Sequence, residues 1–204
     1  RIGDRDLVVV RPTLDDADRV RARTEHHLAR WTAAGRSELA ISVNVSGRRF
    51  QQPDLVERLA ETCRRFDVAP RRLQLEISES TALRDLAAAA ERMGELHEGG
   101  ISAAPDDFGT GYSSLANLVK LPVRRVKPDR EFLRNVPDDP RQSDLVAAML
   151  ALGERLGLQM VAEGVESEQQ LAFLIGRGCT RVQGFFLAPP AEADQAELAF
   201  DASA

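Results

Sequence analysis

Two adjacent carboxylates, Asp106 and Asp107, end an apolar run and precede a turn that contains Gly109 and Gly111. Two acids in one turn repel each other, so their pKa values separate unless a cation keeps both ionised. Mg²⁺ and Mn²⁺ take oxygen ligands and suit such a pair. A single Asp-Asp pair is usually a solvated turn, but here polar residues also end the other apolar runs of the chain. This recurrence favours a metal site.

Short β-type runs alternate with helical patterns along the whole chain. We predict seven strands, over residues 7–10, 40–46, 73–78, 101–106, 124–129, 159–163 and 181–187. Such alternation is typical of parallel strands joined by crossover helices. The polar residues at the strand ends are Asn44, Glu76, Asp106 with Asp107, Lys127 with Asp129, Glu163 and Gln183.

These strand ends decide the fold prediction. A buried charge is costly unless it is paired, so the strand-end residues should share one polar site. In a βα-barrel the C-terminal ends of the strands meet at one rim, where catalysis occurs. An open doubly wound sheet would instead spread them along an edge. We therefore predict an α/β protein with a modified TIM-like (β/α) barrel.

The helical patterns lie between these runs. They predict helices that begin near Thr13, Pro53 and Leu86, and a long helix with Leu145, Met149, Leu152 and Leu156 on one face. Ser167 and Gln170 form a predicted capping box, and a weak helix is predicted over residues 192–199.

The composition describes one globular domain over residues 1–204, with a net charge of −5. This charge argues against a protein that coats DNA or RNA. Cys63 and Cys179 lie in apolar patterns and are predicted to be buried, unpaired thiols, as expected in the cytoplasm. No apolar run reaches the length of a membrane span, and we expect no membrane contact from this segment.

The strand-end set suggests a reaction class. Four or five oxygen ligands can hold one or two divalent cations, and a two-metal site activates water and stabilises a phosphoryl leaving group. Lys127 can orient the water or neutralise developing negative charge. The expected reaction is phosphodiester hydrolysis.

Six motifs in order resemble one family, the bacterial EAL domain, which binds and often hydrolyses cyclic di-GMP to linear pGpG. They cover about residues 28–190. The motifs are Ser42-Val43-Asn44-Val45-Ser46, Leu75-Glu76-Ile77-Ser78-Glu79-Ser80, Asp106 to Leu115, Lys127-Pro128-Asp129, Val161-Ala162-Glu163-Gly164-Val165-Glu166 and Gln183-Gly184.

The resemblance implies a role for each matching residue. The metal ligands, for Mg²⁺ or Mn²⁺, would be Asn44, Glu76, Asp106 and Glu163, with Asp107 completing a second metal and water site. Lys127 would be the catalytic lysine, and Glu79 would brace the loop after the Asp pair. Gln183 and Asp129 would lie on the substrate side of the centre.

The chain also departs from the family. The signature Glu-Ala-Leu, whose glutamate is a further metal ligand, is absent, and Glu25 mimics it only superficially. We therefore expect a barrel that is incomplete at its N-terminus and impaired hydrolysis by residues 1–204. Pro105 and Pro128 replace aliphatic residues in predicted central strands, where each removes a ladder donor.

Two readings of the function stay open. The chain is either a metal-dependent cyclic di-GMP phosphodiesterase, or a catalytically inactive domain that acts as a cyclic di-GMP receptor or protein-interaction module. A homodimer and upstream sensory or signalling domains are further expectations from the resemblance.

Overall fold

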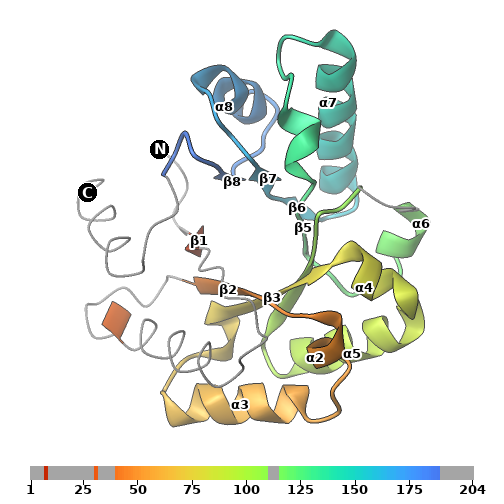
Figure 1. Cartoon of the computed structure of the whole chain (residues 1–204), viewed down its shortest axis with the longest axis vertical. Coiled ribbons are helices and arrows are strands. Elements are labelled where there is room, and N and C mark those ends of the chain that lie inside the picture. Colours follow the sequence, from red (N-terminus) through yellow and green to blue (C-terminus); the bar gives the residue numbers. More distant parts are fainter. Residues whose placement is uncertain (1–6, 9–29, 32–39, 110–114, 189–204) are drawn as a thin grey trace.

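Parallel strands form the centre of the computed structural model, which describes residues 7–8, 30–31, 40–109 and 115–188 (Figure 1). One sheet contains β1 (Leu7–Val8), β2 (Ala40–Asn44), β3 (Leu73–Ser78) and β4 (Ser102–Asp106), in that order. β5 (Arg125–Val126) pairs with β6 (Gln159–Met160), and β7 (Ala162–Glu163) pairs with β8 (Val182–Gln183).

Backbone contacts join these three sheets into one series. A parallel bridge between Phe108 and Pro128 connects the ends of β4 and β5. Only Val161 separates β6 from β7, and its N–H donates to the Val126 carbonyl at 3.0 Å. Counting β6 and β7 as one position, the described residues contain the seven strand positions that the sequence predicts.

Every pairing among the described residues is parallel, and none joins β8 to β1. The α/β architecture with converging parallel strands is therefore confirmed.

Each strand proline pairs with one neighbouring strand without using its own nitrogen, Pro105 with β3 and Pro128 with the end of β4. Pro105 pairs with Ile77, so the hydrogen bonds around it must come from the residues on either side. At Pro128 the bridge uses Phe108 N–H to the Lys127 carbonyl, 3.0 Å, and Asp129 N–H to the Phe108 carbonyl, 3.2 Å. The missing donor of Pro128 therefore faces the β6–β7 side, and the ladder of β5 ends early, at Val126.

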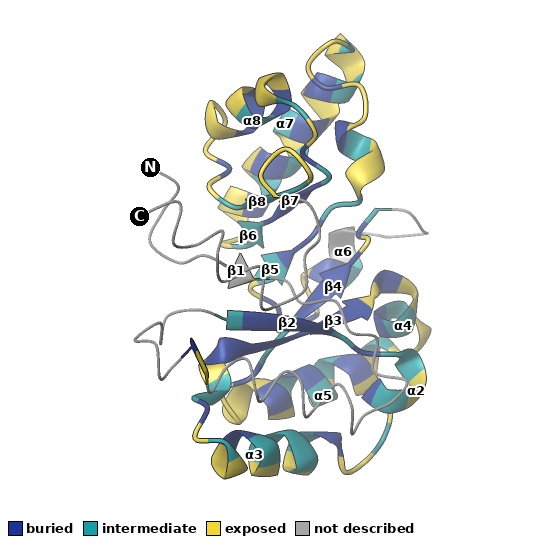
Figure 2. Cartoon of the chain, turned by 60° about the vertical axis from the view of Figure 1, so that its left-hand side comes forward, coloured by how far each residue is buried: buried dark blue, intermediate teal, exposed yellow. Residues whose placement is uncertain are grey.

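The first four strands carry one layer of helices, on the lower side in Figure 1. These are α2 (Gly47–Phe50), α3 (Leu55–Arg65), α4 (Glu79–Arg84) and α5 (Leu86–Glu98), with a 3₁₀ turn η1 (Pro70–Arg72) before β3. Ile41, Leu75 and Ile77 are fully buried beneath them, together with Met93 and Leu96 of α5. Figure 2 shows β2 and β3 almost entirely in the colour of buried residues.

The later strands carry a second group of helices. It consists of α6 (Leu115–Leu118), the 3₁₀ turn η2 (Arg130–Leu133), α7 (Pro140–Arg155) and α8 (Glu168–Ile175). A second apolar cluster forms where η2, α7 and α8 meet β7. The predicted capping box at the start of α8 is confirmed, since Ser167 and Gln170 bond each other's backbone N–H groups.

The apolar face that the sequence predicts for α7 is not the buried face of the helix. Leu145 is 47% exposed and Leu156 39% exposed, whereas Ser143, Val146, Leu150 and Gly153 form the buried face. Both sets of residues recur at helical spacing, but Gly153 favours burial of the set that contains Val146 and Leu150. Its backbone lies so near Met160 that an added Cβ would stand 2.5 Å from the Met160 Cγ.

The last predicted strand, residues 181–187, is also shorter than expected. β8 ends at Gln183, and residues 184–187 form a turn in which the Leu187 N–H donates to the Gly184 carbonyl at 3.1 Å. A Cβ on Gly184 would stand 2.1 Å from the Val165 carbonyl oxygen, so only glycine fits at this turn.

Other predictions fall on residues that the structure does not describe: the helix beginning near Thr13, apart from residues 30–31, and the helix over 192–199. The two cysteines are confirmed as buried free thiols. No helix among the described residues is long and apolar enough to cross a membrane.

Candidate metal and catalytic centre

The ammonium of Lys127 lies at the centre of the strand-end residues. Lys127 directly follows β5, and its side chain is fully buried. Its Nζ lies 2.5 Å from Glu163 Oε1, 2.8 Å from Glu76 Oε2 and 3.3 Å from Asp106 Oδ1. The predicted convergence of β3, β4, β5 and β7 on one polar site is therefore observed for these four residues.

Burial and charge act in opposite directions on Lys127. Burial lowers the pKa of its ammonium, but the attraction of Glu76, Glu163 and Asp106 outweighs this effect and holds the pKa above the ordinary value for a lysine. Lys127 is therefore a cation at neutral pH. An ammonium without these partners would not stay charged so far from water.

Three acids form a compact oxygen cluster beside the lysine. Single carboxylate oxygens of Asp106, Asp107 and Glu163 all lie within 4.8 Å of one another. Asp106 and Glu163 are buried, and Asp107 is exposed. The cluster thus has an inner side on the ammonium and an outer side open to water.

The backbone at Asp107 is unusual. Its φ is +54°, in the left-handed region that non-glycine residues rarely adopt. Gly109 follows with φ +99°, and its N–H donates to Glu79 Oε2 at 2.8 Å. Glu79 is buried at the start of α4, so this hydrogen bond anchors the turn to that helix.

The structure also places the remaining predicted site residues. Asn44 is half-buried at the end of β2 and pairs in register with Glu76. Gln183 pairs in register with Glu163, and its Oε1 is buried without a hydrogen-bond partner among the described residues. The Asp129 carboxylate lies outside the acid cluster, because its Oδ1 accepts from the Glu131 N–H at 2.7 Å and caps η2.

Sequence reasoning missed a second polar layer deeper in the strands. Arg125 donates through Nε to Gln159 Oε1 at 2.7 Å and through Nη1 to Gln74 Oε1. Gln74 and Arg125 each precede a site residue by two positions, as does the buried Ser42. Side chains two apart on a strand share a face, so this period-two polar pattern was the available signal.

The donor set fits a hard divalent cation. Asp106, Asp107 and Glu163 offer clustered carboxylate oxygens, Glu76 adds another on the inner side, and Asn44 offers an amide. Mg²⁺ and Mn²⁺ prefer this all-oxygen chemistry, whereas the two thiols of the chain lie in the cores. The unpartnered Gln183 Oε1 is a further oxygen acceptor near Glu163.

Parallel strands that carry clustered acids and a lysine at their C-terminal ends are typical of βα-barrel domains whose active site binds a divalent metal ion. The model of the EAL domain family matches residues 12–190. The chain belongs to the EAL domain family.

Two relatives show the range of this similarity. The bifunctional diguanylate cyclase/cyclic di-GMP phosphodiesterase MucR of Pseudomonas aeruginosa is 41% identical over 165 residues, 81% of this chain and 24% of MucR. The signaling protein YkoW of Bacillus subtilis is 36% identical over 160 residues, 78% of this chain and 20% of YkoW. The chain thus spans about a fifth to a quarter of the length of these relatives.

Solved structures agree. The MucR phosphodiesterase in complex with c-di-GMP superposes with a TM-score of 0.82 and 38% identity, covering 88% of this chain and 73% of that one. The EAL domain of Mycobacterium smegmatis DcpA gives a TM-score of 0.82 and 35% identity, covering 88% and 80%.

Proposed function

We propose that this chain is a metal-dependent phosphodiesterase domain that hydrolyses cyclic di-GMP to linear pGpG. The observation that carries the proposal is the acid cluster of Asp106, Asp107 and Glu163 beside the buried ammonium of Lys127. The substrate follows from relatives such as MucR, named a cyclic di-GMP phosphodiesterase and solved with c-di-GMP.

Five residues would hold the cation, which we take to be Mg²⁺ or Mn²⁺. The inner ligands are Glu76, Asp106 and Glu163, with Asn44 beside them and Asp107 on the open side. When bound, the cation supplies a Lewis acid that activates water and neutralises negative charge on the phosphoryl group.

Lys127 has two roles in this proposal. Its ammonium holds Glu76, Asp106 and Glu163 together before a substrate arrives. During the reaction it donates a hydrogen bond or balances the charge that develops on the phosphoryl oxygens.

The other residues position the reacting groups. Glu79 fixes the Gly109 N–H and so the turn that carries Asp107. Gln183 offers its free Oε1 to a donor on the nucleotide or to the cation. We assign Asp129 to the substrate side as well, at the start of η2.

The experiment is a turnover assay of purified chain with cyclic di-GMP and Mn²⁺, in which linear pGpG is separated and quantified. Because the signature glutamate is absent, we expect slow hydrolysis, and it should stop when EDTA removes the metal. Lys127→Ala should lower kcat by about 10²–10³-fold, the usual loss when one donor to the transition state is removed.

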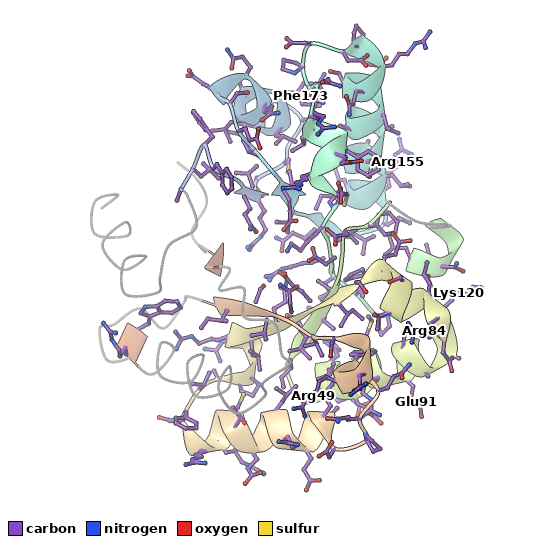
Figure 3. The ribbon with its side chains drawn as sticks, in the orientation of Figure 1. Arg49, Arg84, Glu91, Lys120, Arg155 and Phe173 are labelled. Carbon is purple, nitrogen blue, oxygen red and sulfur yellow. The ribbon has the colours of Figure 1, made fainter. Side chains whose placement is uncertain are left out.

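The control is Lys120→Ala, an exposed lysine on the loop after α6, labelled in Figure 3, which should keep full activity. Hydrolysis that persists in EDTA or in Lys127→Ala would refute the mechanism. Metal-dependent binding of cyclic di-GMP without turnover would instead support the receptor function.

We place this activity in the cytoplasm, where the free thiols Cys63 and Cys179 stay reduced. We also expect the domain to work with sensory or signalling domains in a longer protein and to form a homodimer. Light scattering of the isolated chain tests the last expectation.

A further inference from the structure

The short turn η2 lies between the two loops that follow the acid-bearing strands β4 and β7. One loop begins with Asp107, directly after Asp106 at the end of β4, and the other begins directly after Glu163 at the end of β7. η2 follows a third strand, β5, and begins at Arg130 after its N-cap Asp129, three residues beyond Lys127. It contacts both loops through residues that sequence reasoning did not single out.

The first contact joins Phe132 of η2 to Gly109. A Cβ on Gly109 would stand 2.7 Å from both Cε2 and Cζ of Phe132, so the ring lies directly against the glycine backbone. Backbone hydrogen bonds at Phe108 tie the same loop to Lys127 and Asp129. The Asp107 turn is therefore held by Glu79 on one side and by Phe132 on the other.

The second contact joins η2 to the loop after Glu163. A Cβ on Gly164 would stand 2.6 Å from the Cβ of Arg130, and Gly164 has φ +74°. The buried amide of Gln170 extends this contact. Its Nε2 donates to the Leu133 carbonyl at 2.8 Å, and its Oε1 accepts from the N–H groups of Glu166 at 2.7 Å and Ser167 at 3.2 Å.

The packing around Phe132 leaves some free space. Phe132 lines a cavity of about 20 Å³ together with Leu133 of η2 and Val146 and Leu150 of α7. A shortened side chain at this position would therefore join its empty volume to an existing cavity. The backbone hydrogen bonds of Phe108 with Lys127 and Asp129 would then remain as the tie between this loop and the start of η2.

We infer that Phe132 is a positioning residue for the metal centre. It belongs to η2, which lies between the loop after Asp106 and the loop after Glu163 and contacts both. Asp106 and Glu163 end β4 and β7, and Asp107 begins the loop after β4. Their carboxylates lie within 4.8 Å of one another, and η2 touches the loop that follows each strand, at Gly109 and at Gly164. A cation needs its ligands within tenths of an ångström, so a loop that relaxes toward η2 should weaken binding. This inference rests on the proposed metal site.

The test measures Mn²⁺ affinity by calorimetry, without substrate. Phe132→Ala should lower the affinity about 10–100-fold, the range found when groups that orient metal ligands are removed. Phe132→Leu keeps more of the contact with Gly109 and should lose only about 3–10-fold, a smaller loss of the same origin.

The matched control is Phe173→Ala. Phe173, labelled in Figure 3, lies on α8 in the same apolar cluster, with the Arg177 guanidinium over its ring. Its truncation should reduce stability as much as Phe132→Ala does, yet leave Mn²⁺ affinity unchanged. Urea unfolding of each variant provides that comparison.

The outcomes separate the two proposals. If the wild-type chain binds no Mn²⁺, the metal site itself is refuted, and the positioning role with it. If the wild type binds and both Phe132 variants bind equally well, only the positioning role is refuted. An equal loss in Phe173→Ala would show general loosening and would also refute it. Should Phe132→Ala not fold, Phe132→Leu decides.

Discussion

Asp107 combines a rare backbone conformation with an exposed carboxylate at the acid cluster. A left-handed φ costs a non-glycine residue about 1–2 kcal/mol, least for Asp and Asn. Strained backbone conformations of this kind cluster at functional sites. Here the turn places the Asp107 carboxylate on the open side of the acid cluster.

This gives a prediction for two variants at one position. Asp107→Asn keeps the backbone preference, so the free energy of unfolding should change by less than about 1 kcal/mol, while Mn²⁺ affinity falls at least about 10-fold. Asp107→Val should lose Mn²⁺ binding and also about 1–3 kcal/mol of stability, because a β-branched residue resists a left-handed φ. Urea unfolding and calorimetry measure both quantities. Wild-type Mn²⁺ affinity in Asp107→Asn would remove Asp107 from the ligand set.

At the same scale, the sequence predicted which residues meet but not how. Strand-end position was enough to bring Glu76, Asp106, Lys127 and Glu163 together, because parallel strands end at one rim. It could not show that Lys127 Nζ reaches three carboxylates at once, since this depends on the rotamer of a long side chain. Nor could it show that the Asp129 carboxylate turns away to cap η2.

Among the elements, α7 is where pattern and structure differ. The helix contains two apolar stripes one position apart, and only the stripe with Val146 and Leu150 contacts the second core. Both stripes have helical spacing, but the exposed one carries four large apolar residues whereas the buried one includes Ser143 and Gly153, so the sequence pattern favours the exposed stripe. The choice depends on Gly153, which lets the helix approach Met160 closely.

Two leucine truncations on α7 test this packing. Leu150→Ala should lower the free energy of unfolding by about 2–5 kcal/mol, because it empties a buried position. Leu145→Ala, on the exposed stripe, should change it by no more than about 0.5 kcal/mol. Chemical denaturation of the two variants gives both values. A larger loss for Leu145→Ala would mean that α7 packs through its other face.

At the scale of the whole molecule, the residues that the structure describes form two apolar clusters, and the polar centre draws its residues from the strands of both. One cluster contains buried residues of β2, β3 and α5, and the other contains buried residues of η2, α7 and α8. Glu76 and Asp106 come from strands of the first group, and Glu163 comes from β7 in the second (Figure 1). A cation bound by all three would link the two parts of the chain.

Metal binding should therefore stabilise the entire fold. A ligand at 100 times its Kd that binds only the folded chain adds about 2.7 kcal/mol, which for a chain of this size raises Tm by about 5–10 °C. Scanning calorimetry with and without saturating Mn²⁺ measures the shift.

Glu163→Gln should abolish most of this rise in Tm, since the variant loses a charged ligand between the two parts of the chain. Glu91→Gln, a matched change at an exposed position of α5 labelled in Figure 3, should keep the full shift. If Mn²⁺ leaves the wild-type Tm unchanged, or if it raises the Tm of Glu163→Gln by the same amount, the cation does not link the two parts of the chain through this centre.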